Sequence, residues 1–352
     1  MGLSALSVQH LRCIDSATLD LHPQHNLLWG GNAAGKTSVL EAAYLLGRGR
    51  SFRTRISERL IQHGADHLVV FGRTDDALCQ SIGVQIGRRT EAVAKLNGQL
   101  LPSFADLSRA FPVQVIEPGV HRLLEEGGHR RRRWLDWGVF HVEPRFLEAW
   151  ARYTRGLRQR NAALKSQPET AAVWDVELAR LGEIVASTRA SFMEALLPHW
   201  TTTIARLLNL EIDLHYHRGW PQGLTLAEAF VAAADRDRQR GITHSGPHRA
   251  DVIVKTQGRA AKEVLSRGQQ KMAAVALVLS QLQLLQVTNQ VVATLLLDDP
   301  AAELDGERLG RFREQVMELK CQLLVTALSA SGTPLGRPDR AFHVEQGTVQ
   351  LV

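Results

Sequence analysis

Alternating apolar and polar residues dominate the first third of the chain and predict β-strands there. Residues 3–21 predict two short strands that lead into a third strand at 25–29. Asn97-Gly98 is a hairpin signal. Four further strands are predicted, at residues 67–73, 81–86, 92–96 and 112–116. Together these segments predict a mixed sheet.

The middle of the chain changes to helical spacing. Trp134 and Trp137, three residues apart, predict a helix anchored in a core. Apolar residues then recur on two longer stripes, and Gln167-Pro168 between them ends the first helix. The first stripe is Phe146, Trp150, Tyr153, Leu157 and Leu164; the second is Trp174, Leu178, Leu181, Val185, Thr188, Phe192 and Leu196. Steps of four and three along the second stripe are typical of a packed helical seam, so the pair predicts an antiparallel helical hairpin.

Shorter elements follow this hairpin. Residues 211–217 alternate as a strand, with His215 and His217 on its outer face. A metal site at these two histidines lacks a third ligand at a suitable spacing, so solvent exposure is favoured. Thr225 and Glu228 form a capping box that begins a helix, which Gly241 ends.

The last third carries an apolar helix and a buried strand. The helix runs through Met272, Val275, Leu279 and Leu282. It is interrupted by Ser280, Gln281 and Gln283, and its apolar pattern is too short to span a bilayer. Residues 291–297 form a continuous apolar run typical of a parallel strand.

Composition limits the class of protein. The 352 residues are 44% hydrophobic, enough for a large core, and their number favours two domains. A net charge of +6 is compatible with a polyanionic partner. Cys13, Cys79 and Cys321 form no C-x-x-C motif, and the first residues lack the pattern of a secretion signal. We expect a soluble protein of the reducing cytoplasm, not bound to a membrane.

The segment after the third strand fits the phosphate-loop pattern G-x-x-x-x-G-K-[ST] and leads into a helix. Its predicted residues for binding a nucleoside triphosphate are Gly30, Gly31, Asn32, Ala33, Ala34, Gly35, Lys36, Thr37 and Ser38. Backbone N–H groups and the helix N-terminus would surround the phosphates, Lys36 would reach the terminal phosphates, and Thr37 would offer a hydroxyl to Mg²⁺. The alternatives are a simple glycine-rich turn and a dinucleotide site, but the order Gly30-Gly31-Asn32 lacks the G-x-G of the latter.

Two carboxylates end the buried strand of residues 291–297. In a Walker B element an apolar strand carries an Asp to the sheet edge beside the phosphate loop, so Asp298 is predicted to hold Mg²⁺. Asp299 is predicted to orient and deprotonate an attacking water. The alternative is an Asp-Asp-Pro turn without chemistry.

Ser266 begins the apolar helix, with Gly268 and Gln269 in its first turn. A plain N-cap is one interpretation. The stretch 265–271 also resembles the signature motif of ABC-type ATPases, which closes over a triphosphate held by another subunit, and 302–305 resembles their D-loop. That resemblance assigns a catalytic role to Ser266 and nucleotide contacts to Ser266, Gly268 and Gln269. Thr326 occupies the region of their switch histidine.

Two basic segments have open interpretations. Residues 48–55 are either a solvated turn or a phosphate-facing loop. Arg130-Arg131-Arg132-Arg133 is the densest charge run, and either salt-bridged structure or phosphate contact would explain it.

Taken together, these motifs resemble those of the RecF family of bacterial recombination mediators over nearly the full chain. The matching stretches are the phosphate loop with 38–42, then 49–53, 132–136, 159–161, 246–249, 265–270 and 297–299. Arg12 also matches, which implies a nucleotide contact, but an aromatic residue usual before it is missing. Ala250 stands where the family tends to be acidic.

The resemblance implies an α/β fold: an ABC/SMC-like P-loop ATPase head with an inserted, mostly helical second domain. The head would comprise residues 1–118 and 241–352, and the insert residues 119–240. It further implies an ATP-dependent homodimer that clamps double-stranded DNA at single-strand gaps, with RecR as partner and RecO and RecA in the same pathway. ATP hydrolysis would be weak and DNA-stimulated, acting as a timed switch in DNA repair, replication and the SOS response to DNA damage.

Three other functions fit part of the sequence. A transporter-type ABC ATPase would place Lys36 and Ser266 closer together than their separation here. A P-loop kinase, with Asp299 activating a substrate hydroxyl, leaves the signature-like helix unexplained. A DNA-binding scaffold with a purely structural nucleotide would not depend on Asp299 for turnover.

Overall fold

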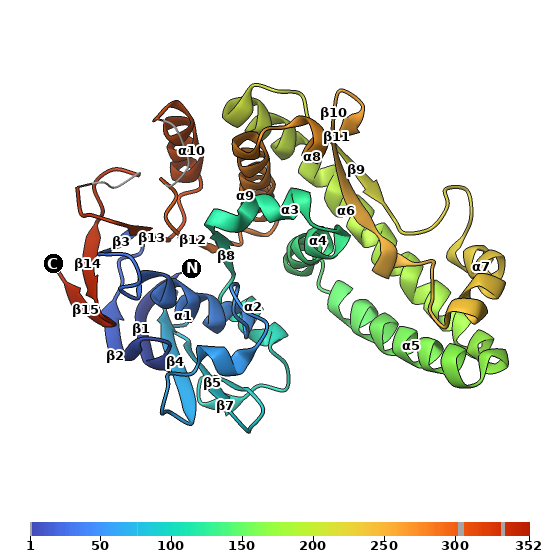
Figure 1. Ribbon diagram of the computed structural model, residues 1–352, viewed down its shortest axis with the longest axis horizontal. Helices are drawn as coiled ribbons and strands as arrows, with labels where there is room; N and C mark the ends of the chain where they lie inside the picture. Colours follow the sequence, from blue (N-terminus) through green and yellow to red (C-terminus); the bar gives the residue numbers. More distant parts are fainter. Residues whose placement is uncertain (1, 76, 302–305, 332–334) are drawn as a thin grey trace. The chain divides into compact units, whose positions relative to one another are not determined.

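The computed structural model describes residues 2–75, 77–301, 306–331 and 335–352. It divides into two compact units (Figure 1): the first contains residues 1–120 and 290–352, and the second contains residues 121–289. Both ends of the chain therefore build the first unit.

A six-stranded sheet at the centre of the first unit carries the phosphate loop. Its strand order is β15-β14-β3-β13-β12-β8, in which all neighbours are parallel except the β14–β15 pair. The strands are β3 (His25–Trp29), β8 (Val113–Ile116), β12 (Thr294–Leu297), β13 (Leu323–Ala327), β14 (Arg340–Glu345) and β15 (Thr348–Leu351). Every residue of β12 and β13 is buried, as expected for central parallel strands. The predicted parallel strand is thus present, but shorter than the apolar run of residues 291–297.

A second sheet in this unit is antiparallel, in the order β2-β1-β4-β5-β6-β7. The strands are β1 (Leu3–Leu11), β2 (Ile14–Asp20), β4 (His67–Thr74), β5 (Ser81–Gly87), β6 (Val93–Leu96) and β7 (Gln99–Leu100). Asn97 and Gly98 take positive φ angles of 51° and 81° and join β6 to β7, so the predicted hairpin is confirmed. Side chains alternate between buried and exposed along β4 and β5.

Helix α1 (Lys36–Arg48) contacts strands of both sheets. Eleven of its thirteen residues are buried, which fits a helix covered on all sides. The remaining helical elements of this unit are η1 (Ser57–Leu60), α2 (Ala105–Ala110), η2 (Pro118–His121, which ends at the boundary) and α10 (Gly306–Glu318).

The second unit is built on two long antiparallel helices, α5 (Phe146–Ser166) and α6 (Asp175–Leu208), joined by η3 (Pro168–Trp174). Arg152 pairs with Glu177 and Arg160 with Asp175, so positions that rise along α5 meet positions that fall along α6. The predicted helical hairpin is confirmed. Helix α6 continues twelve residues beyond the predicted seam, past Pro198, because Trp200, Ile204 and Leu207 extend its buried face.

Smaller elements complete the second unit. A three-stranded antiparallel sheet has the order β11-β10-β9. These elements are α3 (Arg122–Glu125), α4 (Gly128–Val142), β9 (Asp213–His217), α7 (Leu226–Arg240), η4 (Pro247–Arg249), β10 (Asp251–Thr256), β11 (Arg259–Ala260), α8 (Ala261–Val264) and α9 (Arg267–Asn289). Helix α7 has the predicted capping box at Thr225 and ends at Gly241 in the left-handed conformation.

Residues 241–289 group with the second unit, whereas the sequence-based division assigned them to the head. The reason is packing: α9 lies against α4 and α6, and β10 pairs with β9. Helix α9 is also longer than its apolar pattern indicated, and by length and composition alone it could cross a membrane. However, 72% of its most apolar window is buried within the protein, as in a core helix.

Candidate nucleotide site and polar networks

The phosphate loop connects β3 to α1 and is shaped by its glycines. Gly30 has φ 153°, and a Cβ at this position would lie 2.1 Å from the carbonyl oxygen of Val344 on β14. Gly35, with φ 117°, precedes the first residue of α1. Side chains rarely tolerate either position, so the glycines are required by backbone shape and by close packing against β14.

Lys36 lies over the loop. Its Nζ donates to the carbonyl oxygens of Gly30 and Gly31, both at 2.7 Å. Burial lowers the pKa of Lys36, and the carboxylates of Asp299 and Asp298 oppose this effect. A buried ammonium with only carbonyl partners and nearby carboxylates is well placed to receive a phosphate.

Strand order brings the two predicted carboxylates to the phosphate loop. Strand β13 lies between β3 and β12, so the carboxyl ends of all three meet at one edge. Oδ1 of Asp298 accepts hydrogen bonds from the hydroxyls of Thr37 and Thr326, each at 2.9 Å. The backbone N–H of Asp299, a residue with φ 47°, donates to Oγ1 of Thr326 at 2.8 Å. Thr326 therefore links the two consecutive carboxylate residues.

A second cluster joins the first turn of the chain to α1. Glu41, which is fully buried, accepts a hydrogen bond from Arg12 Nη2 at 3.0 Å on Oε1 and another contact from Arg12 Nε on Oε2. Ser51 Oγ donates to the same carboxylate and accepts from the backbone N–H groups of Arg53 and Thr54. Arg12 is thus held at Glu41, and the basic segment 48–55 is attached to α1 at Ser51.

Glu41 and Ser51 were matched in sequence only as part of longer motifs, and no role was assigned to their side chains. The signal that could have identified Glu41 is a carboxylate on the inner face of an otherwise apolar helix. A buried carboxylate requires a cationic or hydrogen-bonding partner.

Ser266, Gly268 and Gln269 belong to the second unit, at the start of α9. The backbone N–H of Ser266 donates to Gln269 Oε1 at 2.9 Å, and the Gln269 N–H donates to Ser266 Oγ at 3.4 Å. This reciprocal arrangement is a capping box, and Ser266 is exposed at the end of the helix. The D-loop-like residues 302–305 lie outside the described part of the chain.

Most arginines of the run on α4 make ion pairs or hydrogen bonds within the protein. Arg130 forms an ion pair with Glu126. Arg131 forms a bidentate ion pair with Asp251, in which both hydrogen bonds are 2.8 Å long. Arg132 donates to the carbonyl oxygen of Ala250 at 2.6 Å. Of the two interpretations of this run, these contacts favour salt-bridged structure for Arg130 and Arg131, and Arg132 is held by a backbone carbonyl. Trp134 and Trp137 are buried, as predicted.

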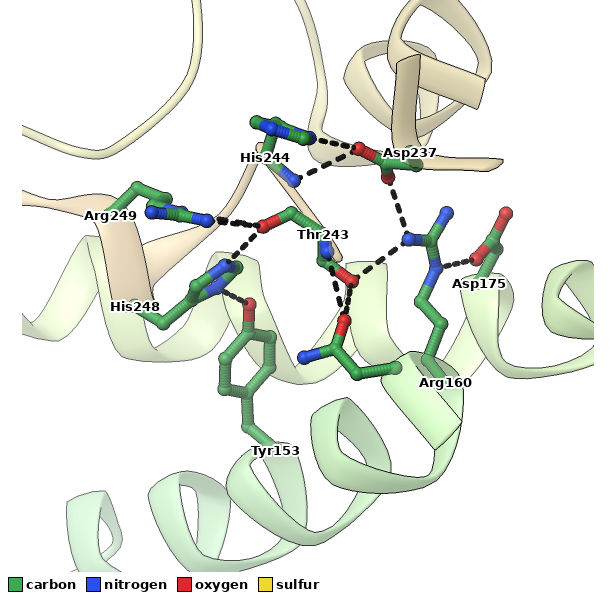
Figure 2. Close-up of polar contacts among 9 residues, drawn as sticks. Tyr153, Arg160, Asp175, Asp237, Thr243, His244, His248 and Arg249 are labelled. Atoms are coloured by element: carbon green, nitrogen blue, oxygen red, sulfur yellow. Dashed lines mark hydrogen bonds and ion pairs between the residues drawn. The ribbon is translucent and has the colours of Figure 1, made fainter. Parts of the chain in front are cut away.

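A polar network in the second unit joins α5 to the segment that contains η4 (Figure 2). Arg160 donates to Asp175 at 2.6 Å, to Asp237 at 2.7 Å and to Thr243 Oγ1 at 2.9 Å. Asp237 also accepts from the backbone N–H of His244 at 3.0 Å. The side chains of Arg160 and Asp237 are almost fully buried. A buried charge needs a partner, and their ion pair provides one for each.

His248 forms the other end of this network (Figure 2). Its Nε2 lies 3.0 Å from the carbonyl oxygen of Thr243, which can only accept, so Nε2 carries the proton. Nδ1 then accepts from the Tyr153 hydroxyl at 2.8 Å. Burial lowers the pKa of His248 to about 4 and raises the pKa of the Tyr153 hydroxyl above its ordinary value.

His215 and His217 are exposed on β9, in agreement with the solvent-facing interpretation. Within residues 2–75, 77–301, 306–331 and 335–352, no three His, Cys, Asp or Glu side chains form a group suited to a metal ion. A metal at the phosphate loop would instead combine one carboxylate with a hydroxyl and the nucleotide itself.

Comparisons with known proteins agree with this geometry. Residues 2–348 match the family model described as the RecF/RecN/SMC N-terminal domain. The chain is 38% identical over 359 aligned positions to the DNA replication and repair protein RecF of Pseudomonas aeruginosa LESB58, covering 99% of this chain and 97% of that protein. It is also 38% identical to the protein of the same description from Pseudomonas putida GB-1, with 99% and 98% covered.

The fold of this chain also matches solved RecF structures. The structure described as the recombination mediator protein RecF with ATP, in the RecFOR pathway, superposes with a TM-score of 0.91 at 25% identity, covering 100% of this chain and 97% of that one. The corresponding ATPrS structure gives 0.88, covering 99% and 98%. An Smc head bound to the C-terminal winged-helix domain of ScpA gives 0.60 at 14% identity, covering 100% and 97%, which is a similarity of fold alone.

Proposed function

Because the chain belongs to the RecF family of DNA replication and repair proteins, within the wider RecF/RecN/SMC group of ATPases, we propose that it is an ATP-controlled clamp for double-stranded DNA. In this proposal ATP joins two copies of the chain around DNA at single-strand gaps, and slow, DNA-stimulated hydrolysis releases them. RecR is the proposed direct partner, and RecO and RecA are proposed to act in the same pathway in the cytoplasm.

The observation that carries the proposal is the group of Lys36, Thr37, Asp298 and Thr326 at one sheet edge. The N-terminus of α1 and the buried Lys36 ammonium lie at this loop, and both would favour a triphosphate there. On phosphate binding, Lys36 would exchange its two carbonyl partners for phosphate oxygens. The loop residues from Gly30 to Ser38 would surround the phosphates.

The residues at the strand edge also fit Mg²⁺. Thr37 Oγ1 and Asp298 Oδ1 lie 2.9 Å apart. Two neighbouring ligands of an octahedral Mg²⁺, each at about 2.1 Å, would be separated by about 3.0 Å. We assign these two residues as metal ligands. When bound, the ion would neutralise the charge of the phosphates.

Asp299 is the proposed general base, because its position after β12 puts a second carboxylate beside the metal site. Thr326 would replace the switch histidine of other ABC-type ATPases. Its hydroxyl cannot accept a proton at neutral pH, so its role would be to position the two Asp residues.

Ser266 would complete the site in a second copy of the chain. The exposed start of α9 offers a hydroxyl and a helix N-terminus, both suited to a terminal phosphate. Contacts that form only when ATP bridges two copies shift the population toward the closed pair, and loss of the terminal phosphate removes that bias.

A mixing experiment tests the shared site. Lys36→Arg impairs the loop of one copy and Ser266→Arg the helix of the other, so each variant alone should neither pair nor hydrolyse ATP. A mixed pair has one site with both elements intact, and it should regain ATP-dependent sedimentation as a dimer together with part of the ATPase activity. No recovery on mixing, with wild type remaining monomeric at saturating Mg-ATP and DNA, would refute the proposal.

A further inference from the structure

The net positive charge of the protein comes from one unit. Residues 121–289 contain 24 lysines and arginines against 17 aspartates and glutamates. The remainder of the chain contains 18 against 19. The excess that makes the protein basic therefore lies wholly in the second unit, although the nucleotide loop lies in the first.

Helix α5 supplies much of this excess. It has five basic residues and one acidic residue, Glu148. Arg160 faces inward and is neutralised by Asp175 and Asp237. The four exposed basic residues, here called the α5 basic stripe, are Arg152, Arg155, Arg158 and Lys165. At 3.6 residues per turn they fall within an arc of about 140°, opposite the buried face.

The members of the stripe differ in their charge partners. Arg152 pairs with Glu177 and Glu148. Within the described part of the chain, Arg155, Arg158 and Lys165 make no ion pair or side-chain hydrogen bond. Uncompensated cations on one helix face repel each other, and a polyanion would relieve that repulsion.

The helix that presents the stripe is held firmly. Phe146, Trp150 and Tyr153 stack along its inner face, with ring centroids 6.4 and 5.8 Å apart. Near its other end Arg160 makes the buried ion pairs of Figure 2. These contacts fix the rotation of α5, and Figure 1 shows the helix along an edge of its unit. The cations therefore have a defined direction before any partner binds.

The chemistry of the stripe selects the kind of partner. None of the large apolar side chains that are exposed in the described residues lies on α5, whereas a protein interface usually has an apolar or aromatic centre. Arg152 and Lys165 are thirteen residues apart, about 20 Å along the helix, a length comparable to roughly six base pairs. Building on the proposed function, we propose that the α5 basic stripe binds the phosphate backbone of duplex DNA.

The test measures duplex DNA affinity, with ATP and Mg²⁺, over a range of salt concentrations. In the full-length variant Arg155→Gln/Arg158→Gln/Lys165→Gln, loss of three phosphate contacts should make the slope of log K against log salt shallower by about 2.7, and affinity near 0.15 M salt should fall roughly tenfold to a hundredfold. Glutamine has nearly the helix propensity of arginine, and circular dichroism would verify that the fold is kept. Arg155→Lys/Arg158→Lys keeps the charges and should bind like wild type.

A matched control removes three exposed cations of the first unit: Arg89→Gln, Lys95→Gln and Lys320→Gln. Its affinity should stay within about threefold of wild type, with only a small change of slope. An equal loss in both variants would indicate a general charge effect and overturn the inference. Unchanged DNA binding in the α5 variant would also overturn it and would point to an acidic protein at this face. Failure of wild type to bind duplex DNA with ATP would instead refute the proposed function.

Discussion

Oδ1 of Asp298 accepts from two threonine hydroxyls that belong to different elements, Thr37 on α1 and Thr326 on β13. A hydroxyl has one proton, so Thr326, which donates to Asp298, can only accept from the Asp299 N–H. One small side chain thereby orients both carboxylate residues of the predicted Walker B element. A histidine at this position would titrate near neutral pH, whereas the hydroxyl of Thr326 does not.

Thr326→Val removes this hydroxyl but preserves the shape of the side chain. We expect ATP turnover to fall about tenfold, because a lost hydrogen bond to a charged group costs about 1.5 kcal/mol of transition-state positioning. ATP affinity should change less, since the phosphate loop is untouched. Steady-state kinetics and equilibrium ATP binding measure the two effects. Thr326→Ser restores the hydroxyl and should recover turnover, whereas equal rates in all three proteins would exclude the positioning role.

Single residues differ in how well the sequence predicted them. The placement of Lys36 against its loop and of Thr37 opposite Asp298 follows from local motifs together with strand order. The sequence did not predict the partner of Arg12, because Glu41 lies 29 positions away and meets Arg12 through the packing of β1 against α1. Catalytic and binding roles for these residues stay predictions, since geometry alone does not measure turnover.

Elements with strong periodicity were predicted well, and those defined by their neighbours were not. Strand β3 and the two hairpin helices follow directly from apolar spacing and from the Gln167-Pro168 stop. Strands β14 and β15 were not predicted, although β14 closes over Gly30. The pairing of β14 with β3 joins residues more than 300 positions apart, so a short sequence window cannot reveal it.

His248, in the segment between α7 and β10, predicts how the stability of the protein depends on pH. The folded-state pKa of His248, about 4, is below its ordinary value of 6.5, so the unfolded chain binds more protons between these two pH values. The free energy of unfolding should therefore fall as the pH drops from about 6.5 to 4, by up to about 3 kcal/mol from this group. Protonation of Nδ1 would also break its hydrogen bond from Tyr153.

His248→Gln tests this assignment, because an amide can still donate to Thr243 but cannot titrate. Denaturant unfolding at several pH values should show a weaker pH dependence in the variant and, near pH 7.5, a loss of about 1–2 kcal/mol. Comparison with wild type is essential, since burial raises the pKa of Asp136 and this group favours the folded state as pH falls. Parallel pH curves for the two proteins would show that another group is responsible.

On the scale of the whole molecule, the chain returns to its first compact unit at residue 290, whereas the sequence-based division placed the return at residue 241. The apolar pattern of α9 is the same whether the helix packs on the head or on α4 and α6. Only tertiary contacts assign it to the second unit. As a result, the two proposed phosphate-binding helix starts, α1 and α9, lie in different units of one chain.

Asp299→Asn tests whether hydrolysis, and not merely ATP binding, controls the proposed clamp. The amide keeps the size of the side chain but cannot act as a base, so turnover should fall at least a hundredfold while ATP-dependent pairing remains. The paired state should then persist on duplex DNA after free ATP is removed, as followed by sedimentation and by release of labelled DNA. Lys36→Arg, which impairs ATP binding, should not form this persistent state. If Asp299→Asn hydrolyses ATP and releases DNA at wild-type rates, the nucleotide has a structural role and the protein is a DNA-binding scaffold.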